Sequence, residues 1–338
     1  MKNRFDQILS QIDSIGMGKH KDDLLANAEI NRATYINHES VGSLMKIGAN
    51  SDALIVSAGP SLLREKTFER FLSCNQKKKL PLICIDATLI RLLKNGIIPD
   101  YCVVLDPHPI RMLRWFGDEN SEVNNLKDDY FSRQDLDVDF RNKPPIQSKE
   151  DIDLVNKYAR FINIVPSVSI HPHLTKRLVE ANFKSYFWWT PLVDNPNKKD
   201  SITKILYQLS NKNAMNTGGN VGAASWILAS FLMNFKKIGV IGMDYAYYED
   251  TNFINTQTYY ELRAIARSEE ELKNFFKFDS GIGNKVFFQD PTFSWYCQNL
   301  KEIVEKSNTI MFNCSEAGLL IGKNIQQMAL EDFYKGVK

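Results

Sequence analysis

The chain has 338 residues, of which 43% are hydrophobic and 24% charged, the balance of an ordinary globular protein. This length is enough for one large α/β domain with an appendage, or for two modest domains. The formal net charge is only +2 and the basic residues are scattered, which argues against a nucleic-acid-binding protein. The five cysteines form no C-x-x-C pair, so we expect no zinc site of that spacing and favour a reducing compartment.

The N-terminal residues show no apolar signal core, and no stretch approaches the roughly 20 apolar residues of a membrane span. We therefore expect a cytoplasmic protein without a membrane span. Residues 1–48 are polar, with apolar residues such as Phe5, Ile8 and Ile12 at helical spacing. This pattern predicts a helical appendage over 1–48, a main domain over 49–325 and a C-terminal tail over 326–338.

From Asp52 onward, short apolar runs alternate with helix-length segments. These runs predict strands at 53–56, 82–85, 101–105, 161–165, 186–189, 238–241 and 309–312. Such runs are typical of parallel strands covered on both faces. The sequence therefore predicts an α/β fold, a Rossmann-like, mostly parallel sheet with helices on both faces. Residues 107–160 and 249–296 are predicted insertions, and the second is a candidate lid.

Parallel α/β sheets bind ligands at the carboxyl ends of their strands, so the residues there are candidates for a site. Ser57-Ala58-Gly59-Pro60-Ser61 follows the first strand of the main domain directly. Gly59 allows close backbone approach, Pro60 suits the first turn of a helix, and Ser61 adds a hydroxyl beside N–H groups expected to be exposed. The loop predicts phosphate binding; a plain strand-to-helix turn is the alternative.

A second glycine-containing loop holds Thr217, Gly218, Gly219 and Asn220. It precedes residues 223–235, which are almost wholly apolar and predict a buried helix. Two glycines and a Thr hydroxyl at the start of a buried helix favour a second anion-binding nest. Close helix packing through small residues is the alternative explanation.

Acidic side chains follow two further strands. Asp86 and Asp106 stand at strand ends, and His108 lies two residues beyond Asp106. These carboxylates are candidates for hydrogen bonds to a ribose or base, or for a metal ion. The alternative is helix capping, which Asp does routinely.

The last two strands end in polar residues as well. Asp244 follows the strand at 238–241, with Glu249 and Asp250 nearby, and Asn313 and Ser315 close the final strand. A strand-end carboxylate such as Asp244 favours a ligand contact, because buried charges need partners. By contrast, His171-Pro172-His173 has no carboxylate at metal-ligand spacing and is interpreted as a loop.

Taken in order, these segments resemble one known family. The matching stretches are Val56–Leu62, Gly96–Asp100 leading to Leu105-Asp106-Pro107, Thr217–Val221 with Ile241–Asp244, and Asn313–Gly318. They are similar to the domain of motility-associated-factor flagellin glycosyltransferases, which is shared with archaeal 6-hydroxymethylpterin diphosphokinases (MptE-like). The resemblance covers roughly residues 50–322 and extends more distantly to sialyltransferases that use CMP-sialic acid.

The glycosyltransferase resemblance implies a CMP-activated nonulosonic acid as donor, a protein or glycan acceptor and no metal. The implied nucleotide- and phosphate-binding residues are Ser57, Ala58, Gly59, Pro60, Ser61, Asp86, Asp106, Thr217, Gly218, Gly219, Asn220, Asn313 and Ser315. Asp244 would lie near the nucleotide or sugar.

The chain departs from the sialyltransferases in one respect, since no His follows the Gly-x-Asp strand. A general base would come from Glu249, Asp250, Glu261 or Asp279, or from His108. The diphosphokinase alternative implies Mg²⁺ held by Asp86 and Asp106 against ATP phosphates. A non-catalytic nucleotide-binding protein is the third interpretation.

Overall fold

A computed structural model describes residues 22–108, 113, 115–117 and 149–336. The helix predicted near Phe5–Ile15 and most of the predicted 107–160 insertion lie outside these residues. The main sheet has nine strands, all paired in parallel. In spatial order they are β1 (Glu39–Ser40), β6 (Ser185–Trp188), β5 (Asn163–Pro166), β4 (Tyr101–Val104), β3 (Leu82–Ile85), β2 (Asp52–Val56), β9 (Lys237–Ile241), β13 (Ile310–Asn313) and β14 (Ile325–Gln327).

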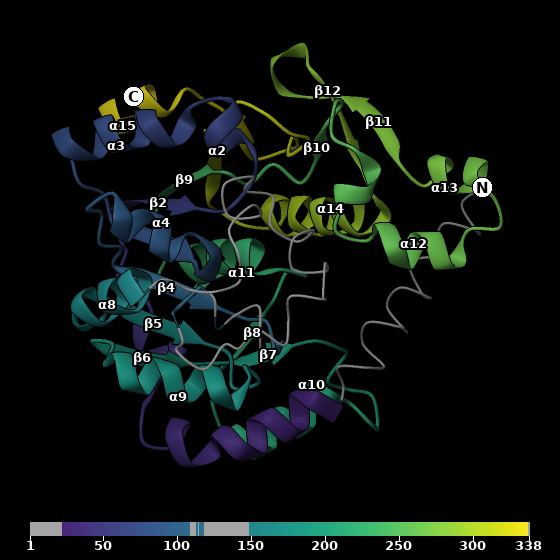
Figure 1. Cartoon of the computed structure of the whole chain (residues 1–338). Helices are drawn as coiled ribbons and strands as arrows, with labels where there is room; N and C mark the ends of the chain where they lie inside the picture. The colour runs from purple at the N-terminus through teal and green to yellow at the C-terminus, as the bar shows by residue number, and fades with distance from the viewer. Residues whose placement is uncertain (1–21, 109–112, 114, 118–148, 337–338) are drawn as a thin grey trace.

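Helices cover both faces of this sheet, as the sequence predicts (Figure 1). One core contains side chains of the helix at 22–35 and of α3 (Thr67–Lys77), α4 (Leu89–Lys94), α8 (Lys149–Tyr158), α9 (Pro172–Ala181), α10 (Ile202–Ser210) and α15 (Leu330–Lys335). The other contains side chains of α11 (Val221–Ile227), its π-helical continuation Leu228–Leu232, and α14 (Pro291–Glu305).

Alternation along the strands explains the two cores. In β2, Leu54 and Val56 belong to the first core, whereas Ala53 and Ile55 belong to the second. Successive side chains of a strand point to opposite faces, so a strand buried on both sides must be apolar at every position. The same rule applies in β3, where Cys84 and Ile83 divide between the two cores.

Residues 22–48 pack onto the main domain. Ala28 and Tyr35 of the helix at 22–35 are fully buried, and β1 pairs with β6 at the edge of the sheet. The boundary of the predicted appendage at residue 48 stays a prediction.

A smaller antiparallel sheet stands beside α14 (Figure 1). Its strands are β10 (Tyr247–Tyr248), β12 (Val286–Gln289) and β11 (Lys277–Ser280), accompanied by α12 (Tyr259–Ile265) and α13 (Glu269–Asn274). Stacked aromatic rings fill its core; the centroids of Phe253 and Phe276 are 4.1 Å apart. The short strands β7 (Thr190–Leu192) and β8 (Ala214–Asn216) form a separate parallel pair.

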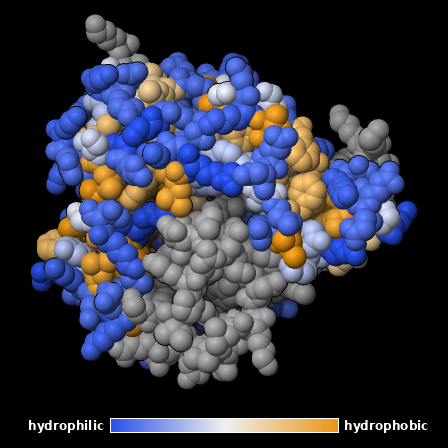
Figure 2. Space-filling model, turned by 45° about the horizontal axis from the view of Figure 1, so that its top comes forward, coloured by the Kyte–Doolittle hydropathy of each residue, from blue (hydrophilic) through white to orange (hydrophobic). Residues whose placement is uncertain are grey.

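The surface seen in Figure 2 carries apolar residues in small groups, separated by hydrophilic side chains. Within the described ranges, no helix has both the length and the apolar character needed to cross a bilayer.

Candidate functional site

The predicted binding residues that follow β2, β3, β4, β9 and β13 lie at one edge of the main sheet. Because β2, β3, β4, β9 and β13 are all parallel, the loops that follow them leave from the same edge. The strands β3 to β6 extend from β2 in one direction, whereas β9, β13 and β14 extend in the other. The strand order therefore reverses between β2 and β9, the position at which open α/β sheets bind ligands.

The two glycine-containing loops adjoin at this edge. A Cβ atom added to Gly222, at the start of α11, would lie 3.2 Å from Ser57 Oγ. The loop 57–61 and the loop 217–222 therefore lie side by side, although 155 or more residues separate them in sequence.

The backbone of the Gly-Pro-Ser loop bonds to β9 and the residues after it. The N–H groups of Ser57 and Gly59 donate to the carbonyls of Ile241 (2.9 Å) and Gly242 (2.7 Å). Our expectation of exposed N–H groups at these positions is therefore wrong: the loop turns them toward the neighbouring strand, where they satisfy carbonyls. Phosphate binding by this loop stays a prediction, and its donors would have to come from other groups.

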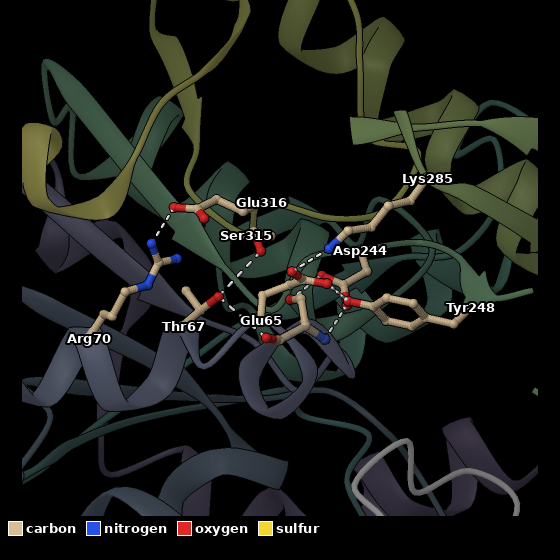
Figure 3. Close-up of polar contacts among 9 residues, drawn as sticks. Glu65, Thr67, Arg70, Asp244, Tyr248, Lys285, Ser315 and Glu316 are labelled. Carbon is tan, nitrogen blue, oxygen red and sulfur yellow. Dashed lines mark hydrogen bonds and ion pairs between the residues drawn. The ribbon is translucent and has the colours of Figure 1, made fainter. Parts of the chain in front are cut away.

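Asp244 completes this arrangement (Figure 3). Its Oδ2 accepts the Ser61 N–H at 2.8 Å and its Oδ1 accepts the Ser61 hydroxyl at 2.6 Å. Burial raises the pKa of Asp244 to about 7, although the two bonds from Ser61 act to lower it. A Cβ atom on Gly59 would lie 2.6 Å from Oδ2, so only glycine leaves room for the carboxylate. The geometry gives Asp244 a structural role, and its predicted catalytic role remains untested.

Asn313 and Ser315 are bonded within the protein in the same way. Asn313 donates to the Leu320 carbonyl at 3.1 Å and accepts the Ser315 N–H at 3.0 Å, while Ser315 Oγ accepts the Met243 N–H at 3.3 Å. Both side chains are at least 99% buried. We call Ser57–Ser61, Gly242–Asp244 and Asn313–Ser315 the seam, because they join β2, β9 and β13 by mutual hydrogen bonds.

Asp86 differs from the seam carboxylate. It is 3% exposed, and its Oδ1 accepts the Ala87 N–H at 2.7 Å. Its Oδ2 is buried and has no hydrogen-bond partner in the part of the chain that the structure describes. Burial, with a smaller contribution from the charge of Asp106, raises the pKa of Asp86 to about 8, against the bond from Ala87. At neutral pH this carboxyl group therefore keeps a proton and offers an unused oxygen.

The loop 217–220 also holds an unused polar group. Thr217 Oγ1 accepts the Gly219 N–H at 3.1 Å, so the Thr hydroxyl stabilises its own turn. Asn220 Oδ1 accepts the Ala223 N–H (3.0 Å) and the Tyr245 hydroxyl (3.2 Å), while its buried Nδ2 finds no partner among the described residues. We call Asp86, Asp106 and the loop 217–220 the open side.

Tyr245 directly follows the Gly-Met-Asp motif, but its sequence position alone gave it no role. Its backbone has φ = 49°, a left-handed conformation that non-glycine residues adopt at some cost. This conformation carries its hydroxyl to Asn220. The position of this tyrosine, immediately after a strand-end motif, was the sequence feature that could have indicated its contact with the 217–220 loop.

His108 lies beside Asp106, whose Oδ1 accepts the His108 N–H at 2.7 Å. Asn27, from the helix at 22–35, donates to the carbonyls of Pro107 (3.4 Å) and Ser169 (3.1 Å). It thereby holds the loop that carries His108 next to the N-terminus of α9. His171 is the N-cap of that helix, so His171-Pro172-His173 begins a helix and is not the predicted loop. Burial, then the charges of His173 and His108, lower the pKa of His171 to about 4, so its ring is neutral at pH 7.

The other predicted bases lie on the small sheet and its helices. Glu249 and Asp250 follow β10 and are exposed, and Asp250 pairs with Arg64 at 2.5 Å. Glu261 belongs to α12, and Asp279 is exposed on β11. His108 therefore follows the carboxyl end of β4, whereas Asp250 reaches the helix that follows the Gly-Pro-Ser loop through its pair with Arg64.

Glu65 connects the small sheet to the short helix α2 (Ser61–Arg64), which follows the Gly-Pro-Ser loop (Figure 3). Its carboxylate accepts the Tyr248 hydroxyl at 2.7 Å and Lys285 Nζ at 2.5 Å. Burial alone would raise the pKa of Glu65, but the bonds from Lys285 and Tyr248 outweigh it and lower that pKa.

Across the described ranges, no cluster of three or more His, Cys, Asp or Glu side chains is arranged to hold a metal ion. The Mg²⁺ alternative would thus rest on Asp86 and Asp106 alone. That pair fits a nucleotide-bound Mg²⁺, which takes one or two carboxylates and completes its shell with phosphate oxygens and water. A cation bound there would also favour the ionised form of Asp86, which otherwise keeps its proton at neutral pH.

Comparison with known proteins agrees with the motifs. Residues 26–128 match the family model of 6-hydroxymethylpterin diphosphokinase MptE-like proteins. No curated protein matches the chain significantly. Among solved structures, the chain is similar to the MAf glycosyltransferase from Magnetospirillum magneticum AMB-1, with a TM-score of 0.55 and 14% sequence identity. The match covers 93% of this chain and 39% of that chain.

The chain thus spans about two fifths of the length of this structural neighbour. At this identity the likeness establishes the fold. The resemblance predicted from the motifs is confirmed: the chain is similar to the MptE-like family in residues 26–128 and to a MAf glycosyltransferase in its α/β fold.

Proposed function

We propose that this chain is a glycosyltransferase domain that uses a nucleotide-activated sugar, a CMP-nonulosonic acid, to modify a protein or glycan. The likeness to a MAf glycosyltransferase supports this proposal through the fold. The observation that carries it is the unpartnered Asp86 Oδ2, buried beside the point where the strand order reverses. A buried polar atom without a partner costs about 1–3 kcal/mol, and a ligand that bonds to it removes that cost.

In this proposal the ligand binds on the open side. Protonated Asp86 donates a hydrogen bond to an oxygen of the ribose or base, and Asp106 accepts one. Thr217, Gly218, Gly219 and Asn220 line the donor phosphate and sugar. The seam lies next to these residues and presents Ser57 Oγ and Ala58 to the ligand. As in the related sialyltransferases, the leaving CMP is stabilised by hydrogen bonds, without a metal.

His108 is the proposed general base. Its ring accepts the proton of the acceptor hydroxyl while that oxygen forms a bond to the anomeric carbon of the donor. The bond between that carbon and the CMP phosphate oxygen breaks, and CMP leaves with the electron pair. General base catalysis of this kind contributes about 10²–10⁴-fold.

The MptE-like match favours a second candidate, 6-hydroxymethylpterin diphosphokinase. In that reaction Asp86 and Asp106 would hold Mg²⁺ against the ATP phosphates and neutralise developing charge. Both carboxylates would then be ionised, in contrast to the protonated Asp86 of the glycosyltransferase proposal.

A thermal-shift experiment separates the candidates. CMP or CMP-N-acetylneuraminic acid should raise the melting temperature without added metal, because a ligand that binds only the folded state stabilises it. Stabilisation by ATP with Mg²⁺ and none by CMP would instead establish the diphosphokinase as the better candidate.

Donor hydrolysis tests the base. His108→Gln should lower the rate by at least about 100-fold, whereas Glu249→Gln should leave it unchanged. Equal rates in both variants would exclude His108 as the base. No donor hydrolysis above background by the unaltered chain, with CMP still bound, would favour a non-catalytic nucleotide-binding protein.

A further inference from the structure

Helix α14 places two aromatic side chains against the loop 217–220. A Cβ atom on Gly219 would lie 2.6 Å from Tyr296 Cδ1 and 2.8 Å from Trp295 Cζ3. Gly219 also has φ = 95°, which disfavours any side chain there. The loop therefore packs directly on the two rings, and the indole of Trp295 lies next to the predicted donor-binding turn.

Trp295 is the most exposed tryptophan among the described residues. It is 41% exposed, whereas Trp188, Trp189 and Trp226 are fully buried. Its ring centroid is 5.3 Å from that of Tyr296, so the neighbouring ring supports it on one side. An indole held in place beside a polar loop offers a flat apolar surface, with a negative π face, to the C–H groups of a sugar ring.

Asn220 offers a hydrogen-bond donor in the same loop. Its Oδ1 is fixed by two donors, the Ala223 N–H and the Tyr245 hydroxyl, and this fixes which end of the amide is Nδ2. Nδ2 is buried and finds no partner among the residues described. An amide held so firmly with its donors unused indicates a ligand oxygen as the missing partner.

The neighbouring backbone holds this arrangement in place. Gln289, at the end of β12, donates from Nε2 to the Tyr245 carbonyl at 2.6 Å. It thus stabilises the left-handed conformation of Tyr245 that brings the hydroxyl to Asn220. The small sheet, through β12, therefore contributes to the donor side of the site.

We propose that Trp295, Tyr296 and Asn220 form a sugar subsite, in which a pyranose ring of the donor stacks on Trp295 while Asn220 Nδ2 donates to an oxygen of that sugar. This inference rests on the proposed function and names the part of the donor that this face of the site recognises. It predicts that Trp295 discriminates a nucleotide-sugar from the bare nucleotide.

The test compares CMP with CMP-N-acetylneuraminic acid in binding to the intact chain by calorimetry. Trp295→Ala should raise the Kd of the nucleotide-sugar about tenfold and that of CMP less than twofold, because only the sugar contacts the indole. Trp295→Phe should give a Kd for the nucleotide-sugar between those of the unaltered chain and Trp295→Ala. Tyr207→Ala, at a 48% exposed aromatic residue on α10, is the matched control and should change neither Kd.

Asn220→Asp provides a second variant if the tryptophan substitution disturbs folding. The aspartate keeps an oxygen for the Ala223 N–H and the Tyr245 hydroxyl but replaces the Nδ2 donor. It should weaken binding of the nucleotide-sugar more than binding of CMP, because CMP is affected only by the added charge whereas the nucleotide-sugar also loses the hydrogen bond from Nδ2.

The outcomes distinguish the two proposals. Equal losses for CMP and CMP-sugar, or no loss for either, in Trp295→Ala and Asn220→Asp would overturn the sugar subsite while nucleotide binding stands. If the unaltered chain binds neither ligand, the proposed function fails and the subsite fails with it.

Discussion

The seam and the open side lie on the same edge of the sheet but use their polar groups in opposite ways. In the seam, the Ser61 N–H and hydroxyl both donate to Asp244. On the open side, Asp86 Oδ2 and Asn220 Nδ2 are buried and have no partner within the described ranges. Both sides contain a buried carboxyl with a raised pKa, yet only Asp86 has an oxygen to spare.

This difference shows that a conspicuous motif can serve the fold more than the ligand. Gly-Pro-Ser and Gly-x-Asp look like ligand loops in the sequence, but in the structure they bond to each other across the reversal of strand order. The seam thereby fixes the position of Ser57, against which the start of α11 on the open side packs. Our proposal therefore places the ligand against the unsatisfied polar groups of the open side, because those of the seam are bonded within the protein.

The largest expected effect is on folding, from removal of the seam carboxylate. Asp244→Ala leaves the Ser61 N–H and hydroxyl buried without partners and should lower the free energy of unfolding by about 2–4 kcal/mol. Urea unfolding measures this loss. Asp250→Ala removes a carboxylate of the same type whose side chain is 71% exposed, and it should cost at most about 1 kcal/mol. Similar losses in both variants would contradict the structural role of the seam.

Asp86→Asn should change how stability depends on pH. The unfolded chain releases this proton near the ordinary pKa of 3.8 and the folded chain at about 8. The free energy of unfolding of the unaltered chain should therefore fall as pH rises from 4 to 8, and the asparagine variant should lack this component.

The two curves should diverge by about 2 kcal/mol between pH 5 and pH 6.5, measured by urea unfolding at each pH. Parallel curves would show that Asp86 ionises normally in the folded chain. The open side would then hold no neutral acid.

The smallest expected effect is at Glu65, which joins the small sheet to the helix after the seam. Glu65→Gln should lower the free energy of unfolding by about 1 kcal/mol at pH 7. Because the folded pKa of Glu65 is lowered, this contribution is present above its unfolded pKa and is lost as pH falls through the folded value. Glu305→Gln, in an exposed pair with Lys323, is the control and should be neutral. A loss that persists unchanged in acid would argue against the ion pair.

Much of the fold was predictable from local pattern. All seven predicted strands are present, because short runs such as 53–56 and 82–85 are apolar at every position, as a strand buried on both faces requires. The two-residue strand β1 and the small sheet were not predicted, since their pairing depends on distant partners such as β6 and β12.

The residues of the site were predictable by place but not by role. Strand-end position identified Ser61, Asp86 and Asp244 together, yet it could not tell which carboxyl would be satisfied by Ser61 and which would be left unpaired. That distinction depends on which loop faces which neighbour across the sheet, a contact between residues 183 apart in sequence.

The most direct test is a crystal structure of the chain with CMP. We predict an oxygen or nitrogen of CMP within hydrogen-bond distance of Asp86 Oδ2, and N–H groups of Ser57, Gly59 and Ser61 still bonded to Ile241, Gly242 and Asp244. A CMP phosphate seated on the Gly59 and Ser61 N–H groups, with the seam bonds broken and Asp86 out of contact, would contradict the account.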